Sequence, residues 1–391
     1  MKIIAAACAF IPLAATATPV DPNFSLDNSD DLGIRFNKFG HVTGEIMKFD
    51  YPMSYRNATW LRESTDAIST VHRKDCMNCN QDKGPRKFQD YIMDILGTPP
   101  SHPERNLNAP YWKELLQVVK VQEDRNNNVA VEEYIPLPCL WSGFSMEDVA
   151  MAVRNELPGK WHFALLETFL REGVTFSKVV PALGNDGFLY REVMLSGLNG
   201  AAIVEVGETN FRTKWTHGRA RPEEVAWLIN VGNITTENDG VPAELVRRIK
   251  AMNLADATDF TAYKDEGSPT HPSWPAMHSA GASGSVWMAT VMDLTEEQFC
   301  EVQKLDFSIA YARTVAGVHY ETDNIAGLTL GNKLVGDWLP HYLSDHYGSK
   351  KKVVRDRVKK VRKEVNWKKF LKSKCAKSSG SCSGSDSDSD F

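Results

Sequence analysis

The region from Ser145 to about Tyr342 limits the fold most strongly, because its apolar residues recur at helical spacing and strand-like alternation is scarce. Helix-start signals support this pattern, with a capping arrangement at Ser145-Met-Glu-Asp148 and Pro222 followed by two glutamates in a first turn. The sequence therefore predicts an all-α fold with a helical bundle core. The expected helical and apolar segments are 145–156, 161–172, 195–206, 222–231, 241–252, 278–292, 295–315 and 323–342.

Composition divides the rest of the chain. Residues 1–17 have the three parts of a secretory signal peptide, with Lys2, an apolar run and a small-residue cleavage site at Ala15-Thr-Ala17. Residues 18–140 are rich in Pro, Asn and Asp, and we expect them to wrap irregularly around a helical domain at 141–347. No later apolar run reaches the roughly 20 residues that span a bilayer. The sequence predicts a secreted, soluble protein without a transmembrane segment.

Charge is divided unevenly. Residues 350–374 carry thirteen Lys or Arg against two acids, and since the whole chain carries −5, the remainder carries −16. An acidic body argues against nucleic acid as the main partner. We expect residues 348–391, basic and then Ser/Asp-rich, to form a disordered tail. Valines at helical spacing within it also fit a basic amphipathic helix that docks on an acidic surface.

Six cysteines remain after Cys8 is lost with the signal peptide, an even number that suits disulfides in an oxidising compartment. Cys76 and Cys79 form a C-x-x-C pair that also fits a redox pair or half a zinc site, but no second pair matches it. Structural use is therefore favoured for the whole set: Cys76, Cys79, Cys139, Cys300, Cys375 and Cys382.

Two histidines, His271 and His278, flank a proline-rich stretch ahead of a small-residue helix. A helix that begins near His278 presents its N-terminus there, and helix N-termini favour anions. A histidine flanked by prolines is also a common turn residue. The segment gains weight from two basic segments elsewhere in the chain.

The first basic segment holds Lys214 and Arg221, which share one face if the segment is helical. The second holds Arg313, His319 and Asp323. In a helix, Asp323 lies close enough to hold one imidazole nitrogen of His319, fix its tautomer and raise the basicity of the other nitrogen. Singly, such residues are ordinary surface cations or helix-face pairs. Together they predict a site for a tetrahedral oxyanion, with one histidine as ligand or nucleophile and one as acid/base.

These segments resemble the three motifs of the vanadium-dependent haloperoxidase and type 2 phosphatidic acid phosphatase superfamily: K-x6-R-P, P-S-G-H and S-R-x5-H-x3-D. This chain has Lys214…Arg221-Pro222, Pro275-Ala-Met-His278 and Ala312-Arg313…His319…Asp323. The resemblance spans about 145–345 and implies a helical fold. It also implies that an oxyanion's oxygens are held by Lys214, Arg221, Arg313 and the backbone N–H of Met277. By the same resemblance His319 bonds vanadium or attacks phosphorus, His278 is the acid/base residue, and Asp323 orients His319.

The block HPSWPAMH is similar to the H-P-x-Y-P-S-G-H form of algal bromoperoxidases, which places His271 on the halide side. This likeness, the predicted secretion and the long N-terminal extension favour a haloperoxidase. Its cofactor is then vanadate, with hydrogen peroxide and bromide or iodide as substrates and hypohalous acid as product. The alternatives are a secreted acid phosphatase with a phosphohistidine intermediate and a catalytically impaired oxyanion-binding relative. Oligomer formation is compatible with the sequence.

The chain departs from the motifs at three positions. Ala276 and Met277 replace the serine and glycine before the second-motif histidine, and Ala312 replaces the serine before Arg313. Ala276 lacks a hydroxyl donor, and a lost hydrogen bond to a charged group costs about 1.5–3 kcal/mol. We therefore expect weakened anion binding.

Overall fold

The computed structural model describes residues 92–97, 100, 109–154, 158–184, 188–217, 219–264, 267–269 and 271–378. The predicted signal peptide, most of the predicted wrapping region, the C-x-x-C pair, Cys382 and the Ser/Asp-rich end lie outside these ranges. Within them the chain is helical apart from one short two-stranded sheet, so the all-α prediction is confirmed. The described helices include none with the length and apolar character needed to cross a bilayer.

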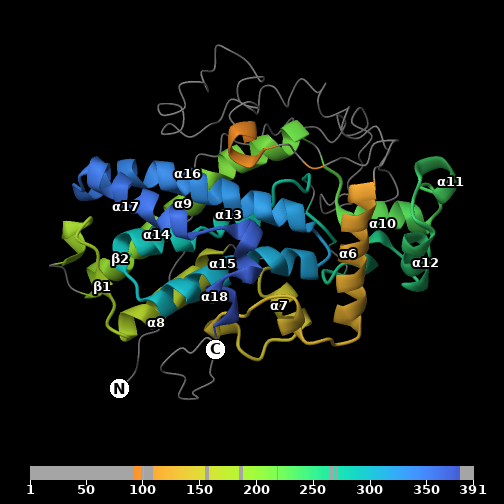
Figure 1. Ribbon diagram of the computed structural model, residues 1–391, viewed down its shortest axis with the longest axis horizontal. Helices are drawn as coiled ribbons and strands as arrows, with labels where there is room; N and C mark the ends of the chain where they lie inside the picture. The colour runs from red at the N-terminus through yellow and green to blue at the C-terminus, as the bar shows by residue number, and fades with distance from the viewer. Residues whose placement is uncertain are drawn as a thin grey trace, which may run out of the picture.

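The elements follow one another in the order shown by the colours of Figure 1. After a helical turn at 92–96, the α-helices are α6 (Ala109–Asn126), α7 (Met146–Met151), α8 (Gly159–Arg171), α9 (Phe188–His217), α10 (Pro222–Asn230), α11 (Thr236–Asp239), α12 (Ala243–Ala251), α13 (Met277–Gly281), α14 (Gly284–Val291), α15 (Glu296–Val315), α16 (Glu321–Tyr347), α17 (Lys351–Glu364) and α18 (Lys374–Lys377). The 3-10 turns are η3 (Val131–Glu133), η4 (Cys139–Trp141), η5 (Pro181–Gly184), η6 (Ala257–Phe260) and η7 (Trp367–Lys372). Strands β1 (Thr175–Phe176) and β2 (Met292–Asp293) pair antiparallel, with Thr175 opposite Asp293.

The helix expected at 278–292 is divided into α13 and α14, which is a correction to the sequence analysis. The carboxylate of Asp306 accepts hydrogen bonds from the backbone N–H groups of Gly284 at 3.1 Å and Ser285 at 2.8 Å. These groups begin α14, so a buried acid from α15 starts a new helix here. His162 binds the same carboxylate at 2.7 Å. The break depends on contacts that are remote in sequence.

Helix α16 is the centre of the bundle and packs against α9, α13, α14, α15 and α17 (Figure 1). Its contact with α13 requires glycine. A Cβ atom on Gly327 would lie 2.4 Å from the carbonyl oxygen of Ala276, and one on Gly331 would lie 1.9 Å from that of Ala280. This close approach brings the second motif against the start of α16, which carries Asp323, the last residue of the third motif.

Two apolar clusters meet beside His319, the histidine of the third motif. The larger cluster spans α7, α8, α9 and the helices α13 to α17 and includes Val318. The smaller joins α6, α10 and α12 and includes Tyr320. His319 lies between these two residues and is 1% exposed. The third motif therefore lies at the junction of the two apolar clusters.

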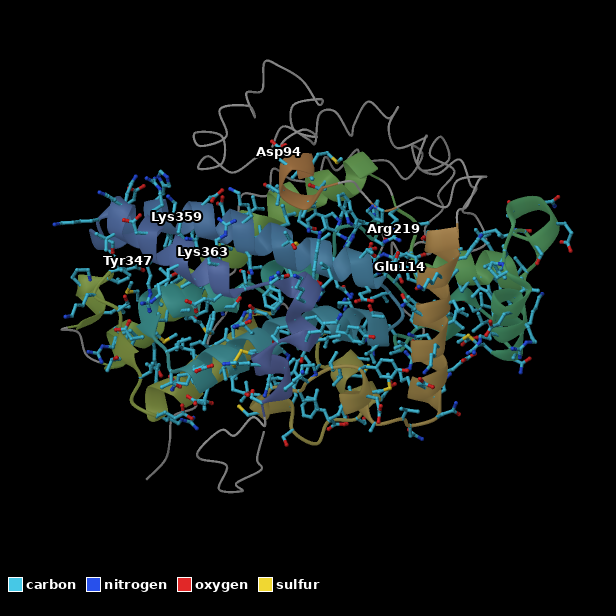
Figure 2. All side chains as sticks on the ribbon, in the orientation of Figure 1. Asp94, Glu114, Arg219, Tyr347, Lys359 and Lys363 are labelled. Atoms are coloured by element: carbon cyan, nitrogen blue, oxygen red, sulfur yellow. A yellow bond between two sulfur atoms is a disulfide. The ribbon has the colours of Figure 1, made fainter. Side chains whose placement is uncertain are left out.

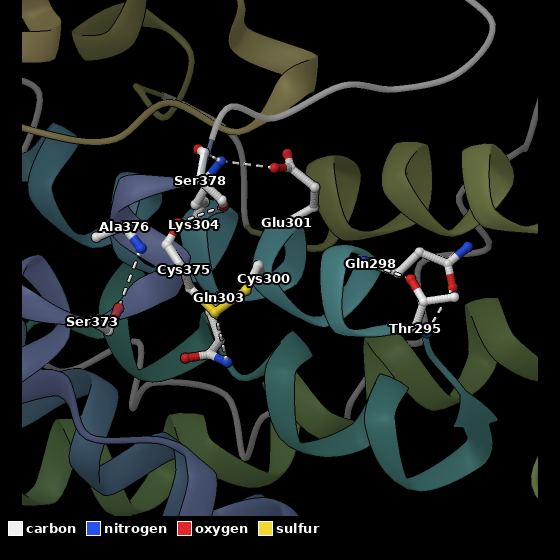
Figure 3. The surroundings of a disulfide bond; sticks show 10 residues. All are labelled: Thr295, Gln298, Cys300, Glu301, Gln303, Lys304, Ser373, Cys375, Ala376 and Ser378. Carbon is white, nitrogen blue, oxygen red and sulfur yellow. Dashed lines mark hydrogen bonds and ion pairs between the residues drawn. A yellow bond between two sulfur atoms is a disulfide. The ribbon is translucent and has the colours of Figure 1, made fainter.

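The basic segment after Tyr347 forms helices up to residue 378, which differs from the expected disorder. Val354, Val358 and Val361 of α17 are buried against the bundle, while Lys359 and Lys363 lie on its exposed face (Figure 2). A disulfide between Cys300 and Cys375 joins α15 to α18, and Lys304 binds both Glu301 and the carbonyl oxygen of Ser378 (Figure 3). The apolar stripe and the covalent link hold this segment in place despite its charge.

Candidate functional site

The first and second motifs are joined by a buried lysine. Lys214 lies near the end of α9, is 0% exposed, and donates hydrogen bonds to the carbonyl oxygens of Pro272 and Ser273, both at 2.8 Å. Arg221 is the N-cap residue of α10, and α9 ends at His217. The expectation that Lys214 and Arg221 share one helical face is therefore wrong. They meet because the chain turns between two helices.

Arg221 connects all three motifs. Its Nε donates to the carbonyl oxygen of His271 at 2.9 Å, and its Nη2 lies 3.1 Å from Nδ1 of the same histidine. Its Nη1 donates to the carbonyl oxygen of Val318 at 2.7 Å and lies 3.3 Å from Nε2 of His319. The guanidinium thus lies between the two histidines.

His319 and Asp323 are paired as expected, with 3.2 Å between Nδ1 and Oδ2. The pair spans the start of a helix, because Tyr320 is the N-cap residue of α16. Burial, together with Arg221 and Lys214, holds the pKa of His319 well below its usual value, so the imidazole is neutral. A neutral ring that donates from Nδ1 to Asp323 has its lone pair on Nε2. That nitrogen faces Arg221.

Arg313 of α15 supplies a third buried cation. Its Nη1 donates to the carbonyl oxygen of Val153 at 2.9 Å and to the hydroxyl of Tyr263 at 2.8 Å. Its Nε–H is buried and has no hydrogen-bond partner within the described part of the chain. Burial, together with the charges of Arg221 and Arg313, holds the pKa of Lys214 well below its usual value, and Arg313 also lowers the pKa of His319, so the three groups share one electrostatic environment.

The second motif forms the more open side of the site. His271 is partly exposed, and its ring meets Phe211 edge-on at a centroid distance of 4.9 Å. His278 lies in the first turn of α13 and is also partly exposed, whereas Met277 beside it is buried. The N–H of Ala276 donates to the carbonyl oxygen of Asp323 at 3.0 Å, which fastens this segment to the third motif.

The charge balance of the site favours an anion. Lys214 and Arg313 are buried and, among the described residues, hydrogen-bond only to carbonyl and hydroxyl oxygens. Burial raises the pKa of Glu223 to about 7 and that of Glu224 to about 8, so these neighbouring carboxyls offset little positive charge below pH 7. Buried charges are expensive unless they are compensated. An oxyanion in the site would compensate them.

The available donors fit a tetrahedral oxyanion such as vanadate or phosphate. Lys214 directs two hydrogen bonds to carbonyl oxygens, and an ammonium has three donors. Arg313 has a buried Nε–H, and Nε2 of His319 carries a lone pair that lies 3.3 Å from Nη1 of Arg221. Within the described ranges, no group of three or more His, Cys, Asp or Glu side chains is arranged to hold a metal ion.

Several residues that support the site were not predicted from the sequence. Arg219 and Glu114 form an ion pair at 2.8 Å and lie next to each other in Figure 2. Arg219 also binds Asp323 at 2.5 Å, and Tyr263 binds Arg313. Arg219 lies between Lys214 and Arg221 of the first motif, and this position could have singled it out as a site residue. Glu114 and Tyr263 have no such mark in the sequence, because their contacts cross long sequence distances.

Comparison with known proteins supports a relation to one class of enzyme. The chain matches no protein-family model. It is 30% identical to a vanadium-dependent bromoperoxidase of Ascophyllum nodosum over a stretch that covers 34% of this chain and 32% of that protein. The chain is therefore related in part to vanadium-dependent bromoperoxidases, and the matched stretch spans about a third of the length of that relative.

Proposed function

We propose that this protein is a vanadate-dependent haloperoxidase that oxidises bromide or iodide with hydrogen peroxide to hypohalous acid. The observation that carries the proposal is the buried cationic cluster around His319, whose Nδ1 is engaged by Asp323 at 3.2 Å and whose Nε2 faces Arg221 at 3.3 Å. The partial similarity to a vanadium-dependent bromoperoxidase supports it independently.

The proposed roles follow from the contacts and charges of each residue. Lys214, Arg221 and Arg313 would hold the oxygens of vanadate, with the backbone N–H of Met277 as a further donor. His319 would bond vanadium through Nε2, because Asp323 engages its other nitrogen. When bound, vanadate supplies a Lewis acid that activates hydrogen peroxide. The three cations then balance the negative charge on its oxygens.

The two partly exposed histidines would do the remaining work. His278 lies on the open side of the site and would move protons to and from hydrogen peroxide. His271 is held neutral, since burial and the charges of Lys214 and Arg221 keep its pKa well below its usual value. Nδ1 of His271 lies 3.1 Å from Nη2 of Arg221 and 3.2 Å from the carbonyl oxygen of Pro272. In the tautomer that accepts from Arg221, Nε2–H would be a donor that suits a halide ion.

An activity assay on the full chain tests the proposal. Metal-free protein incubated with orthovanadate, bromide and hydrogen peroxide should brominate a phenol-type dye, and omission of vanadate should abolish the reaction. His319→Ala should remove activity and vanadate binding together. His346→Ala is a matched control, because His346 is exposed near the other end of α16.

The outcomes separate the alternatives. Hydrolysis of p-nitrophenyl phosphate that requires His319, without any vanadate-dependent bromination, would contradict the proposal and identify a phosphatase. Vanadate binding without either activity would identify an oxyanion-binding relative. Equal bromination by the wild-type protein and His319→Ala would exclude this site as the catalytic centre.

We also propose that the chain is secreted. The disulfide between Cys300 and Cys375 supports this, because such bonds persist in oxidising compartments. Expression in a secreting host should release protein that begins after Ala17, as N-terminal sequencing would show. Intracellular retention with an intact N-terminus would contradict it.

A further inference from the structure

Arg219 is a fully buried arginine placed directly behind the pair of His319 and Asp323. Its Nη1 donates to Oδ1 of Asp323 at 2.5 Å. The other carboxylate oxygen, Oδ2, accepts from the backbone N–H of Tyr320 at 3.0 Å and lies 3.2 Å from Nδ1 of His319. The carboxylate is thus held at both oxygens, and one of them faces the imidazole.

The position of Arg219 is itself fixed from several sides. Its Nη2 donates to Glu114 of α6 at 2.8 Å, and its guanidinium lies 4.0 Å above the ring centroid of Tyr320. Glu114 also accepts from the N–H of Thr322 at 2.9 Å and from its hydroxyl at 2.6 Å. Helix α6 is therefore tied to the first turn of α16 through Glu114 and Arg219. Figure 2 labels these two residues next to each other beside α6.

We propose that Arg219 is a positioning residue for the oxyanion site: it holds the Asp323 carboxylate so that His319 keeps the Nδ1–H tautomer and presents Nε2 to the ligand. Without the contact at Oδ1, the Asp323 carboxylate is held only by the backbone N–H of Tyr320 at Oδ2, so its direction toward the imidazole is fixed less firmly. The Nδ1–H tautomer of His319 then loses part of the acceptor that favours it, and Arg221 beside Nε2 is the remaining constraint on the proton. Groups that orient a metal-ligating histidine typically change metal affinity by about 10- to 100-fold when they are replaced. The part of the inference that concerns vanadate rests on the proposed function, whereas the tautomer depends on this geometry alone.

A purely structural role for Arg219 makes a different prediction. Arg219 is buried and Glu114 is partly buried, and loss of this ion pair weakens the contact between α6 and α16. Arg219 binds Glu114 through Nη2 and Asp323 through Nη1, so Glu114→Gln removes the charge of the ion pair and keeps the bond from Arg219 to Asp323. Glu114→Gln is therefore the matched control for Arg219→Gln.

The experiment measures the tautomer and the affinity separately on the full chain. In vanadate-free protein labelled with 15N-histidine, imidazole NMR identifies the protonated nitrogen of His319, assigned by comparison with His319→Ala. Titration with orthovanadate then gives Kd. We expect the wild type and Glu114→Gln to show the Nδ1–H tautomer. Arg219→Gln should show both tautomers and bind vanadate about 10- to 100-fold more weakly, and Arg219→Lys should lie between.

Two results would overturn the inference. The first is a wild-type tautomer and wild-type Kd in Arg219→Gln, even if that variant has a lower Tm. The second applies if Arg219→Gln does not fold: a Glu114→Gln protein that shows both tautomers and binds vanadate as weakly as Arg219→Lys would assign the effect to the contact between α6 and α16 and not to the bond from Arg219 to Asp323. Wild-type protein that binds no vanadate contradicts the proposed function instead, and the tautomer still tests Arg219.

Discussion

Ala276 stands where the resembling motif has a serine, at the N-cap position of α13 and next to the backbone of Asp323. A serine hydroxyl there can accept from the first turn of the helix and donate to an oxygen of the anion. Alanine does neither. The site therefore depends more heavily on its cations than the motif would suggest.

Ala276→Ser should tighten vanadate binding. A hydrogen bond to a charged group contributes about 1.5–3 kcal/mol, which corresponds to a Kd lower by about 10- to 100-fold. Ala282→Ser, at the other end of α13, is the control for an added buried hydroxyl. Calorimetric titration measures both variants. Unchanged Kd in Ala276→Ser would show that this position does not face the anion.

Anion binding should strengthen as the pH falls. The pKa of His271 is held low by burial and by Lys214 and Arg221, and a bound anion opposes this effect, so binding takes up a proton. Glu223 and Glu224, with pKa values raised to about 7 and about 8, add repulsion when they ionise above those values. Proton uptake by His271 and the loss of charge on Glu223 and Glu224 both strengthen anion binding as the pH falls.

Sulfate is the suitable probe because its charge stays constant over this range. The rise in Tm caused by sodium sulfate, relative to sodium chloride of equal ionic strength, should be larger at pH 5 than at pH 8. His319→Ala measures the contribution of sulfate bound elsewhere. An equal or larger effect at pH 8 would contradict the assigned charge states.

Single residues of the site were predictable where a motif contained them. Spacing alone singled out Lys214, Arg221, Arg313, His319 and Asp323, and the structure brings them together, although their roles remain predictions. Arg219 was marked only by its place in the spacer of the first motif and Glu114 by nothing, because the ion pair between α6 and the turn before α10 is a tertiary contact. Short-range patterns carry no record of such contacts.

At the scale of the helices, the glycines of α16 determine how closely the second and third motifs approach. Gly331→Ala would place a Cβ atom 1.9 Å from the carbonyl oxygen of Ala280, so backbone must move. We expect it to lower the free energy of unfolding by about 1–3 kcal/mol or more and to weaken vanadate binding.

Gly200→Ala on α9 provides the matched comparison. A Cβ atom there meets nothing within 4 Å, so the higher helix propensity of alanine should raise stability by up to about 1 kcal/mol. Urea denaturation measures both variants. If Gly331→Ala were as stable as the wild type, the close contact between α13 and α16 would be wrong.

Helix positions were largely predictable where amphipathic periodicity marks a buried face, as in α8 and α12. The break between α13 and α14 was not, since it depends on Asp306 from another helix. For α17 the sequence left a disordered tail and an amphipathic helix open, and the structure shows the helix. Its cations suggested a solvated tail, but Val354 and Val358 give it a buried face.

At the scale of the whole molecule, the disulfide between Cys300 and Cys375 closes a loop of 75 residues that contains α16 and α17. In the chain-entropy model a loop of this size contributes about 4 kcal/mol. Replacing both cysteines by alanine should lower the free energy of unfolding by about that amount while vanadate affinity stays unchanged. Denaturant unfolding of oxidised, reduced and variant protein tests this. A large loss of vanadate affinity in the folded variant would show that the link also shapes the site.

Docking of the basic α17 surface on an acidic partner stays a prediction, as does oligomer formation. The similarity to a vanadium-dependent bromoperoxidase covers 34% of the chain.

The most direct test of the central claim is vanadate-dependent bromination by the full chain, measured beside His319→Ala. The account predicts dye bromination that requires vanadate, bromide and hydrogen peroxide together and disappears in His319→Ala but persists in His346→Ala. Bromination that is absent from the wild type, or that survives in His319→Ala, would contradict it.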